Sequence, residues 1–181
     1  MGDRMDDMRQ DTPQEDIKKF KEVFLYILSK IGAQPNVGKT VLVKILYFID
    51  FDYYEEKETQ LMGMRYIKKQ YGPYPILFDK IVGDMKREGE ISSVMSNYGT
   101  NHQQKYLPIR GADLNCLSGD ELEYIQKVIN KYSSMTANQL TDYSHKDIPW
   151  LAAKNNEELK YEGVFYRTPD TSVRSYVEIF D

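Results

Sequence analysis

The longest uninterrupted hydrophobic pattern in the chain runs from Gly38 to Tyr54. Its apolar residues recur at helical spacing, about 100° per residue, and they lie on every side of the helix instead of forming one stripe. A helix that is apolar nearly all round is usually enclosed by other elements. The pattern therefore predicts a central buried helix over about residues 38–54, with a single domain built around it.

Burial makes two charged residues of this predicted helix informative, Lys44 and Asp50. Burying an unpaired charge is costly, and the two side chains lie roughly 120° apart around the helix axis, so they do not face each other. We therefore expect each to reach a partner on another element, or the helix to reach the surface at that residue. A structural ion pair or hydrogen-bonded node is the simplest interpretation, with a recognition site or a catalytic carboxylate as the alternatives.

The remaining pattern predicts further helices and a small amount of strand. The first is a helix opened by the capping box Thr12-Pro13-Gln14-Glu15 and closed by Gly32. After the central helix come a strand over 61–68, a stiff turn over 71–75, a helix from Pro75 to Gly89 and a β-hairpin that pairs 91–95 with 105–109. The last two are a helix opened by the capping box at Ser118 and running to about Tyr132, and a short helix opened by the capping box at Thr136. The fold class is mainly α with a small β element, and the helix at 75–88 followed by the hairpin is winged-helix-like in part.

We expect residues 1–12 to form a disordered arm, residues 13–155 a helical domain, and residues 156–181 a C-terminal extension. This extension is polar, with Val164-Phe165-Tyr166 expected to be extended and the last dozen residues loosely held.

Composition narrows the class of protein. The 181 residues are 41% hydrophobic and 29% charged, which is typical of a soluble globular domain. A single cysteine, Cys116, excludes an internal disulfide and favours a cytoplasmic location, and no apolar run is long enough for a membrane span. The net charge of −4 and the lack of a basic block argue against nucleic acid as the main partner.

Three candidate chemistries have weak support. Residues 33–40 fit a relaxed phosphate-binding loop ending in Gly38-Lys39-Thr40, but such a loop follows a parallel strand and the preceding segment has helical periodicity. A DNA-binding winged helix would use the helix at 75–88, whose basic and acidic residues balance. His102, His145 and Cys116 lie far apart without metal-ligand spacing, so we predict no metal and no cofactor.

Three patches in series resemble the Panacea domain, the SocA-like antitoxin family. They are Lys44-Ile45-Leu46-Tyr47-Phe48-Ile49-Asp50, then Tyr66-Ile67 leading to Gly72-Pro73-Tyr74-Pro75 and Phe78, then Leu140-Thr141-Asp142-Tyr143-Ser144-His145 leading to Pro149-Trp150. The resemblance implies a mostly helical fold and the antitoxin half of a type II toxin–antitoxin pair, which neutralises a cognate toxin by binding it. A protease adaptor and a transcriptional regulator are the alternatives that relatives suggest.

The resemblance and the predicted burial together give candidate site residues. A neutralising surface is anchored by aromatic residues, and the candidates for this role are Tyr53, Tyr54, Tyr71, Tyr74 and Trp150. A structural or recognition node is expected from Lys44, Tyr47, Asp50, Gly72, Pro73 and His145. No catalytic residue is predicted. The expected partner is the toxin protein, with an intracellular protease, operator DNA and a second copy of the chain left open.

Overall fold

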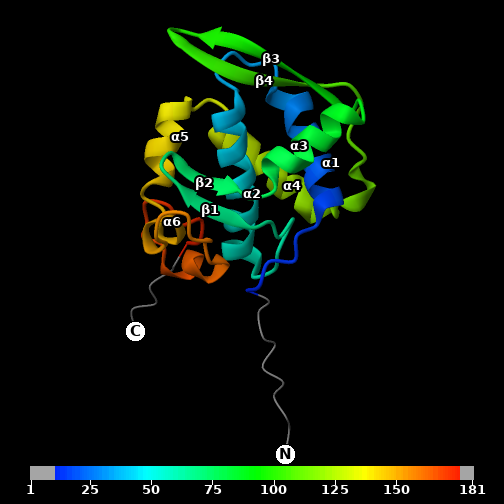
Figure 1. The fold of residues 1–181 in the computed structure, drawn as a ribbon. Helices are drawn as coiled ribbons and strands as arrows, with labels where there is room; N and C mark the ends of the chain where they lie inside the picture. Colours follow the sequence, from blue (N-terminus) through cyan, green and yellow to red (C-terminus); the bar gives the residue numbers. More distant parts are fainter. Residues whose placement is uncertain (1–10, 176–181) are drawn as a thin grey trace, which may run out of the picture.

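The computed structural model describes residues 11–175, and these form a mainly helical fold with two small two-stranded antiparallel sheets, as predicted. The helix α2 (Lys39–Lys57) runs down the middle of the molecule, with the other elements packed around it (Figure 1). Every residue of α2 from Val41 to Glu55 is buried. The prediction of a central enclosed helix is therefore confirmed, and the helix continues one turn beyond its predicted end.

The helix α1 (Ile17–Ile31) packs beside α2 and buries Phe20, Phe24 and Ile27 in the core. It begins later than predicted, because the side chain of Asp16 accepts a hydrogen bond from the Lys19 backbone N–H at 2.9 Å and so forms the N-cap. The predicted cap at Thr12 is wrong, and Ile17, the first residue of the helix, is 41% exposed.

Residues 1–10 of the predicted disordered arm lie outside the described residues. Where the arm is described, it contacts the end of α2 and the loop that follows, since Tyr54 donates a hydrogen bond to Asp11 and the Gln60 side-chain amide donates one to the Thr12 carbonyl at 2.7 Å.

A tight hairpin lies across the front of α2 and is formed by β1 (Tyr66–Lys69) and β2 (Gly72–Pro75) (Figure 1). The predicted strand over 61–68 is therefore too early, and the predicted stiff turn over 71–75 is mostly a strand. Pro73 pairs with Lys68 and Pro75 with Tyr66. Two prolines fit here because each sheet has only two strands, so β2 is an edge strand.

The helix α3 (Phe78–Arg87) leads into a long ribbon formed by β3 (Ile91–Tyr98) and β4 (Asn101–Pro108). The predicted hairpin is confirmed and is longer than expected, with a register that pairs Ile91 with Pro108 and Tyr98 with Asn101. The base of the ribbon joins the core through Ile91 and through Tyr106, which packs against Phe24 and Phe78. The rest of the ribbon extends over the ends of α1 and α2 (Figure 1).

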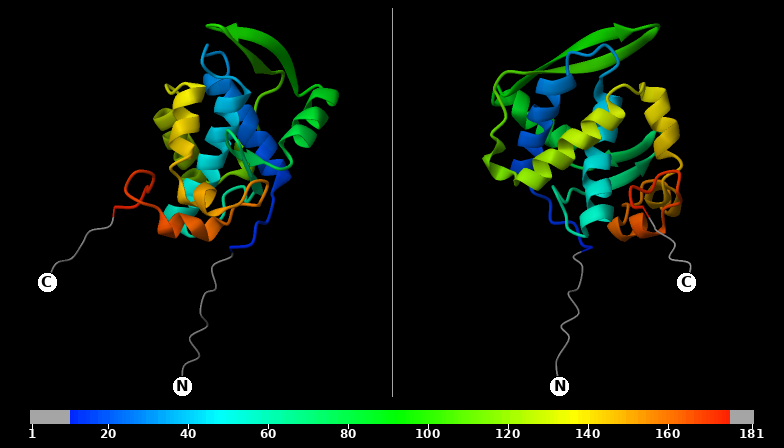
Figure 2. Two further views of the ribbon diagram at one scale, coloured as in Figure 1. Left: turned by 60° about the vertical axis from the view of Figure 1, so that its left-hand side comes forward. Right: turned by 180° about the vertical axis from the view of Figure 1, so that it is seen from behind.

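The second half of the chain supplies the 3₁₀ turn η1 (Leu114–Cys116) and the helices α4 (Gly119–Tyr132), α5 (Ala137–Ser144) and α6 (Ile148–Ala152). The capping boxes predicted at Ser118 and Thr136 are both formed. Figure 2 shows α4 crossing α2 on the side opposite the β1–β2 hairpin. No helix among residues 11–175 is long and apolar enough to cross a membrane.

The segment after α6 is part of the core. Its 3₁₀ helix η2 (Tyr161–Tyr166) packs against α2 and α6 and buries Tyr161 and Val164, so the predicted extended conformation is wrong. The expected loose end is also wrong as far as the structure describes it, because Thr171 is buried and the Val173 backbone N–H donates to Glu55 at 3.0 Å.

The observed cap of α1 gives a direct test of where this helix begins. Replacing Asp16 with Ala removes the side-chain acceptor for the Lys19 N–H, and we expect it to lower the free energy of unfolding by about 1 kcal/mol. Thr12→Ala is the matched control, since only the backbone carbonyl of Thr12 accepts hydrogen bonds. Urea unfolding of both variants measures the difference, and an equal or larger loss for Thr12→Ala would contradict this assignment.

Candidate functional site

The polar residues of α2 are the chemical feature that distinguishes this core. Lys44, Asp50, Asp52 and Glu55 are all buried within an otherwise apolar helix. Asp52 and Glu55 share one neighbour, Arg167, whereas Asp50 and Lys44 face other parts of the chain, so these groups form separate clusters around α2.

The largest cluster surrounds Arg167, whose side chain is 0% exposed. Its guanidinium makes a two-pronged contact with Asp147, at 2.7 Å from Nε and 2.8 Å from Nη2, while Nη1 lies 2.8 Å from both Asp52 and Glu55. Bidentate contacts of this kind are the strongest form of ion pair that a guanidinium makes. Arg167 thus joins the C-terminal segment to α2 and to the residue that precedes α6.

Tyrosine hydroxyls complete this cluster. Tyr47 donates a hydrogen bond to Asp147 at 2.6 Å, and Tyr132 donates one to Asp52 at 3.0 Å. Three carboxylates nevertheless share one guanidinium. Burial raises the pKa of Asp52 to about 6, although the charge of Arg167 opposes this shift.

Asp50 forms a second cluster with the loop before β1. Its carboxylate accepts backbone hydrogen bonds from Met62 at 2.8 Å, Gly63 at 3.0 Å and Met64 at 3.2 Å, and one from the Tyr66 hydroxyl at 2.8 Å. Burial raises the pKa of Asp50 to about 6, while these hydrogen bonds act in the opposite direction. The role of Asp50 is therefore to hold the loop at 62–64 against α2.

Lys44 has no such partner. Its side chain lies against Gly72 and near Ser144, and among residues 11–175 no hydrogen bond or ion pair to its ammonium is formed. Only 2% of the residue is exposed, and burial lowers its pKa to about 8. Of the two charges singled out in the sequence, Asp50 thus reaches partners on another segment, whereas Lys44 reaches none among the described residues.

Gly72 is required by this approach of α2 to β2. A Cβ atom there would lie 2.6 Å from Lys44 Cε and 2.6 Å from Ser144 Oγ, and the φ of +115° is one that other residues rarely adopt. Its neighbour Pro73 is buried in β2. Both are therefore packing positions where β2 meets α2 and α5.

His145 and Trp150 stack on each other, with ring centroids 4.3 Å apart. Lys68 Nζ lies 4.0 Å from the Trp150 ring, and the Trp150 indole N–H donates to the Lys69 carbonyl at 3.2 Å. This stack joins α6 to β1, so Trp150 has a structural contact on one side while remaining partly exposed.

The five predicted aromatic anchors fall into two groups. Tyr53 and Tyr54 are buried and pack on Tyr124 and Tyr161, so they do not present a surface to a partner and this part of the prediction is wrong. Tyr71 is 66% exposed at the turn between β1 and β2. Tyr74 and Trp150 are partly exposed, so these three stay predictions.

The chain that forms this geometry matches a known protein family. A family model described as antitoxin SocA-like, Panacea domain, matches residues 42–151, which is more than half of the chain. The chain therefore belongs to the SocA-like Panacea family. No curated protein and no solved structure matches it. The match contains Asp52, Glu55 and Asp147 but ends before Arg167, which means that this chain supplies the central cation from outside the matched region.

Among residues 11–175 there is no cluster of three or more histidine, cysteine or acidic side chains arranged to hold a metal ion. The buried carboxylates are instead occupied by Arg167 and by backbone N–H groups. The arrangement explains how α2 is held in the core.

Replacing Arg167 with Met leaves three buried carboxylates without a cation. We expect the free energy of unfolding at pH 7 to fall by about 3–5 kcal/mol. Burial already raises the folded-state pKa of Asp52 to about 6, and loss of the guanidinium that opposes this shift raises it further. Asp52 then takes up a proton on folding, so the loss should shrink as pH falls from 7 to 5.

Arg174→Met is the matched control for this experiment, since Arg174 makes a single partly exposed ion pair with Glu58. Surface pairs contribute at most about 1 kcal/mol. Urea unfolding at both pH values gives the comparison. Similar losses for the two variants would show that the Arg167 cluster is not a dominant interaction.

Replacing Lys44 with Met has the opposite predicted sign. The folded protein holds the Lys44 pKa below its unfolded value, so the charged form destabilises the fold below about pH 8. We expect Lys44→Met to raise the free energy of unfolding at pH 7 by on the order of 1–3 kcal/mol. The gain should decline between pH 8 and 10, where the wild-type lysine folds in its neutral form. A loss at pH 7 would mean that Lys44 has a favourable partner.

Proposed function

We propose that this protein is the antitoxin of a toxin–antitoxin pair and that it neutralises its toxin by direct protein–protein contact. Membership of the SocA-like Panacea family carries this proposal. The buried polar groups support it, because Asp50, Asp52, Glu55 and Asp147 all have structural partners within the fold. A protein of this kind acts by covering the working surface of its target.

The β3–β4 ribbon is the surface that best fits such a contact. It carries several exposed hydrophobic residues, namely Val94, Met95, Tyr98, Leu107 and, just beyond β4, Ile109. By the strand register, Val94 lies diagonally across from Leu107 on one face, and Ile109 continues that face. Both outer edges of the ribbon are unpaired within the described residues, so a partner can contact the apolar face and add a strand as well.

The helix next to this ribbon does not favour DNA. Lys80 and Arg87 both pair with Asp84 on α3. Since phosphate contacts by free basic residues dominate DNA affinity, the helix–ribbon unit is better suited to a protein partner.

Co-expression with the product of the neighbouring gene tests the proposal. If that product is toxic, the chain should restore growth and co-purify with it. Leu107 is 42% exposed at the centre of the apolar face, and Leu107→Asp should weaken the complex at least tenfold, which corresponds to about 1.4 kcal/mol.

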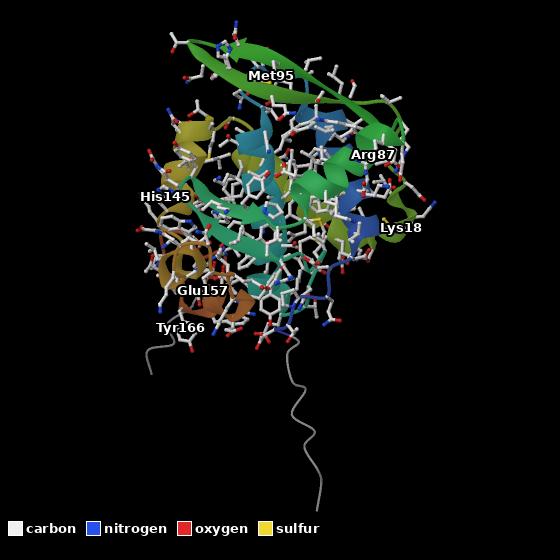
Figure 3. All side chains as sticks on the ribbon, viewed as in Figure 1. Lys18, Arg87, Met95, His145, Glu157 and Tyr166 are labelled. Atoms are coloured by element: carbon white, nitrogen blue, oxygen red, sulfur yellow. The ribbon has the colours of Figure 1, made fainter. Side chains whose placement is uncertain are left out.

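Tyr166→Asp is the matched control. Tyr166 is 75% exposed and lies at the opposite end of the molecule from the ribbon, as the positions of Met95 and Tyr166 show (Figure 3). The Tyr166→Asp variant should bind the toxin as tightly as the wild type does. Undiminished toxicity without co-purification would contradict the antitoxin role, whereas loss of binding in Tyr166→Asp alone would move the contact surface away from the ribbon. A partner whose half-life shortens only in cells that contain an intact protease would favour the adaptor alternative.

A further inference from the structure

The two edges of the β3–β4 ribbon have different surroundings. β4 is the strand that contacts α1 and α2, and its Gln103 side chain donates a hydrogen bond to the Pro35 carbonyl at 2.6 Å. β3 forms the outer edge of the ribbon, away from the helices (Figure 1). No strand other than β4 pairs with β3 among residues 11–175. A further strand can therefore be added to the ribbon most readily beside β3.

The backbone along this outer edge has hydrogen-bonding groups to offer. In a two-stranded antiparallel pair, every second residue of each strand turns its N–H and C=O away from the other strand. Since β3 is eight residues long, about half of its residues present such groups at the outer edge. A row of unpaired backbone groups is a template for pairing with another strand.

β3 also lacks the residues by which proteins usually protect an open edge. Edge strands are commonly guarded by charged side chains or by proline, which discourage pairing. The sequence of β3 contains neither, and reads Ile91-Ser92-Ser93-Val94-Met95-Ser96-Asn97-Tyr98. Val94, Met95 and Tyr98 are 47%, 68% and 39% exposed. The outer strand thus combines free backbone groups with exposed apolar side chains.

The lack of charge makes β3 compatible with a second copy of itself. Two copies that meet edge to edge present identical side chains, so a charge on β3 would lie close to the same charge on the other copy. Residues 91–108 contain one charged side chain, Lys105, although 29% of the whole chain is charged. The Lys105 ammonium is held by the carbonyl oxygens of Gln34 at 2.7 Å and Val37 at 2.8 Å. The ribbon is therefore a neutral arm on a chain whose net charge of −4 makes its copies repel each other on average.

We propose that two copies of this chain associate through their β3 edges and form one continuous four-stranded antiparallel sheet. Because β4 lies against the helices, each copy offers its β3 edge alone and the assembly closes at two copies. This inference does not depend on the antitoxin role. A toxin that adds a strand beside β3 would have to displace the second copy, so the dimer would be the form of the chain without toxin.

Side-chain alternation restricts how the two copies align. Residues directly opposite each other in an antiparallel pair point to the same face of the sheet. A two-fold axis perpendicular to the sheet also relates the same face of both ribbons, so it must pass beside one residue and not between two. Met95, the most exposed apolar residue of β3, then lies at the axis, and Val94 lies opposite Ser96 of the partner subunit.

Sedimentation equilibrium of the purified full chain, without toxin, tests this proposal. One pair of strands buries less than a standard interface of about 1,600 Å². We therefore expect a dimer with a dissociation constant on the order of 10 μM, measured from tenfold below to tenfold above that concentration. A mass equal to that of one chain at every concentration would overturn the proposal.

Met95→Glu and Met95→Lys each place two like charges beside each other at the axis. Because the Met95 side chain is largely exposed, both variants should fold like the wild type, and each should weaken the dimer at least tenfold. An equimolar mixture of the two variants brings glutamate next to lysine and should restore a mixed dimer, which also shows that both variants are folded. A dimer of unchanged affinity in Met95→Glu, or no restoration in the mixture, would overturn the proposal.

Two control variants should remain dimeric. Leu151→Glu introduces the same charge at a residue of α6 that is 51% exposed, and Leu107→Asp changes β4 and leaves the β3 edge intact. Loss of the dimer in Leu151→Glu, with Met95→Glu still dimeric, would place the contact at α6 and overturn the proposal. A monomeric wild type would leave the antitoxin role standing, and failure to bind the toxin would leave the dimer standing.

Discussion

The contact between Arg167 and the carboxylates of Asp52, Glu55 and Asp147 is the interaction on which this structure depends. An acidic side chain inside a core is tolerated only when it is paired and hydrogen-bonded, and α2 carries two of these three acids among its fully enclosed residues. A single guanidinium satisfies both of them and the residue that precedes α6. Since Arg167 follows directly after η2, the packing of α2 is completed only when the C-terminal segment is in place.

The central helix could be predicted because its signal is local. Apolar residues on every side of residues 41–54 leave no solvent face, and the capping boxes at Ser118 and Thr136 lie within four consecutive residues each. Two other local signals, the proline pair in β2 and the capping pattern at Thr12, predicted the wrong structure. The pair Pro73 and Pro75 indicates a turn, yet a two-stranded sheet has free edges that accept both. Thr12 has the right residues after it for a cap, yet Asp16 lies nearer the first buried turn of α1.

The cluster around Arg167 could not be predicted from the sequence because its members are distant along the chain. Arg167 lies 115 residues from Asp52, 112 from Glu55 and 20 from Asp147. It also stands in a polar stretch that has no periodic apolar pattern. The only available signal was indirect, since Asp52 lies inside a helix predicted to be buried all round and so required a cation from somewhere. A buried Lys44 likewise required an anion or a hydrogen-bond acceptor, yet the described residues provide none for it.

The central claim is that the C-terminal segment and α2 form one cooperative unit held together by buried charge. Native-state hydrogen exchange of the full chain tests this most directly. The account predicts that the amides of residues 43–54 and of the buried part of residues 161–173 exchange with the same free energy of opening, close to that of global unfolding. Rapid exchange throughout residues 161–173 while α2 stays protected would contradict it.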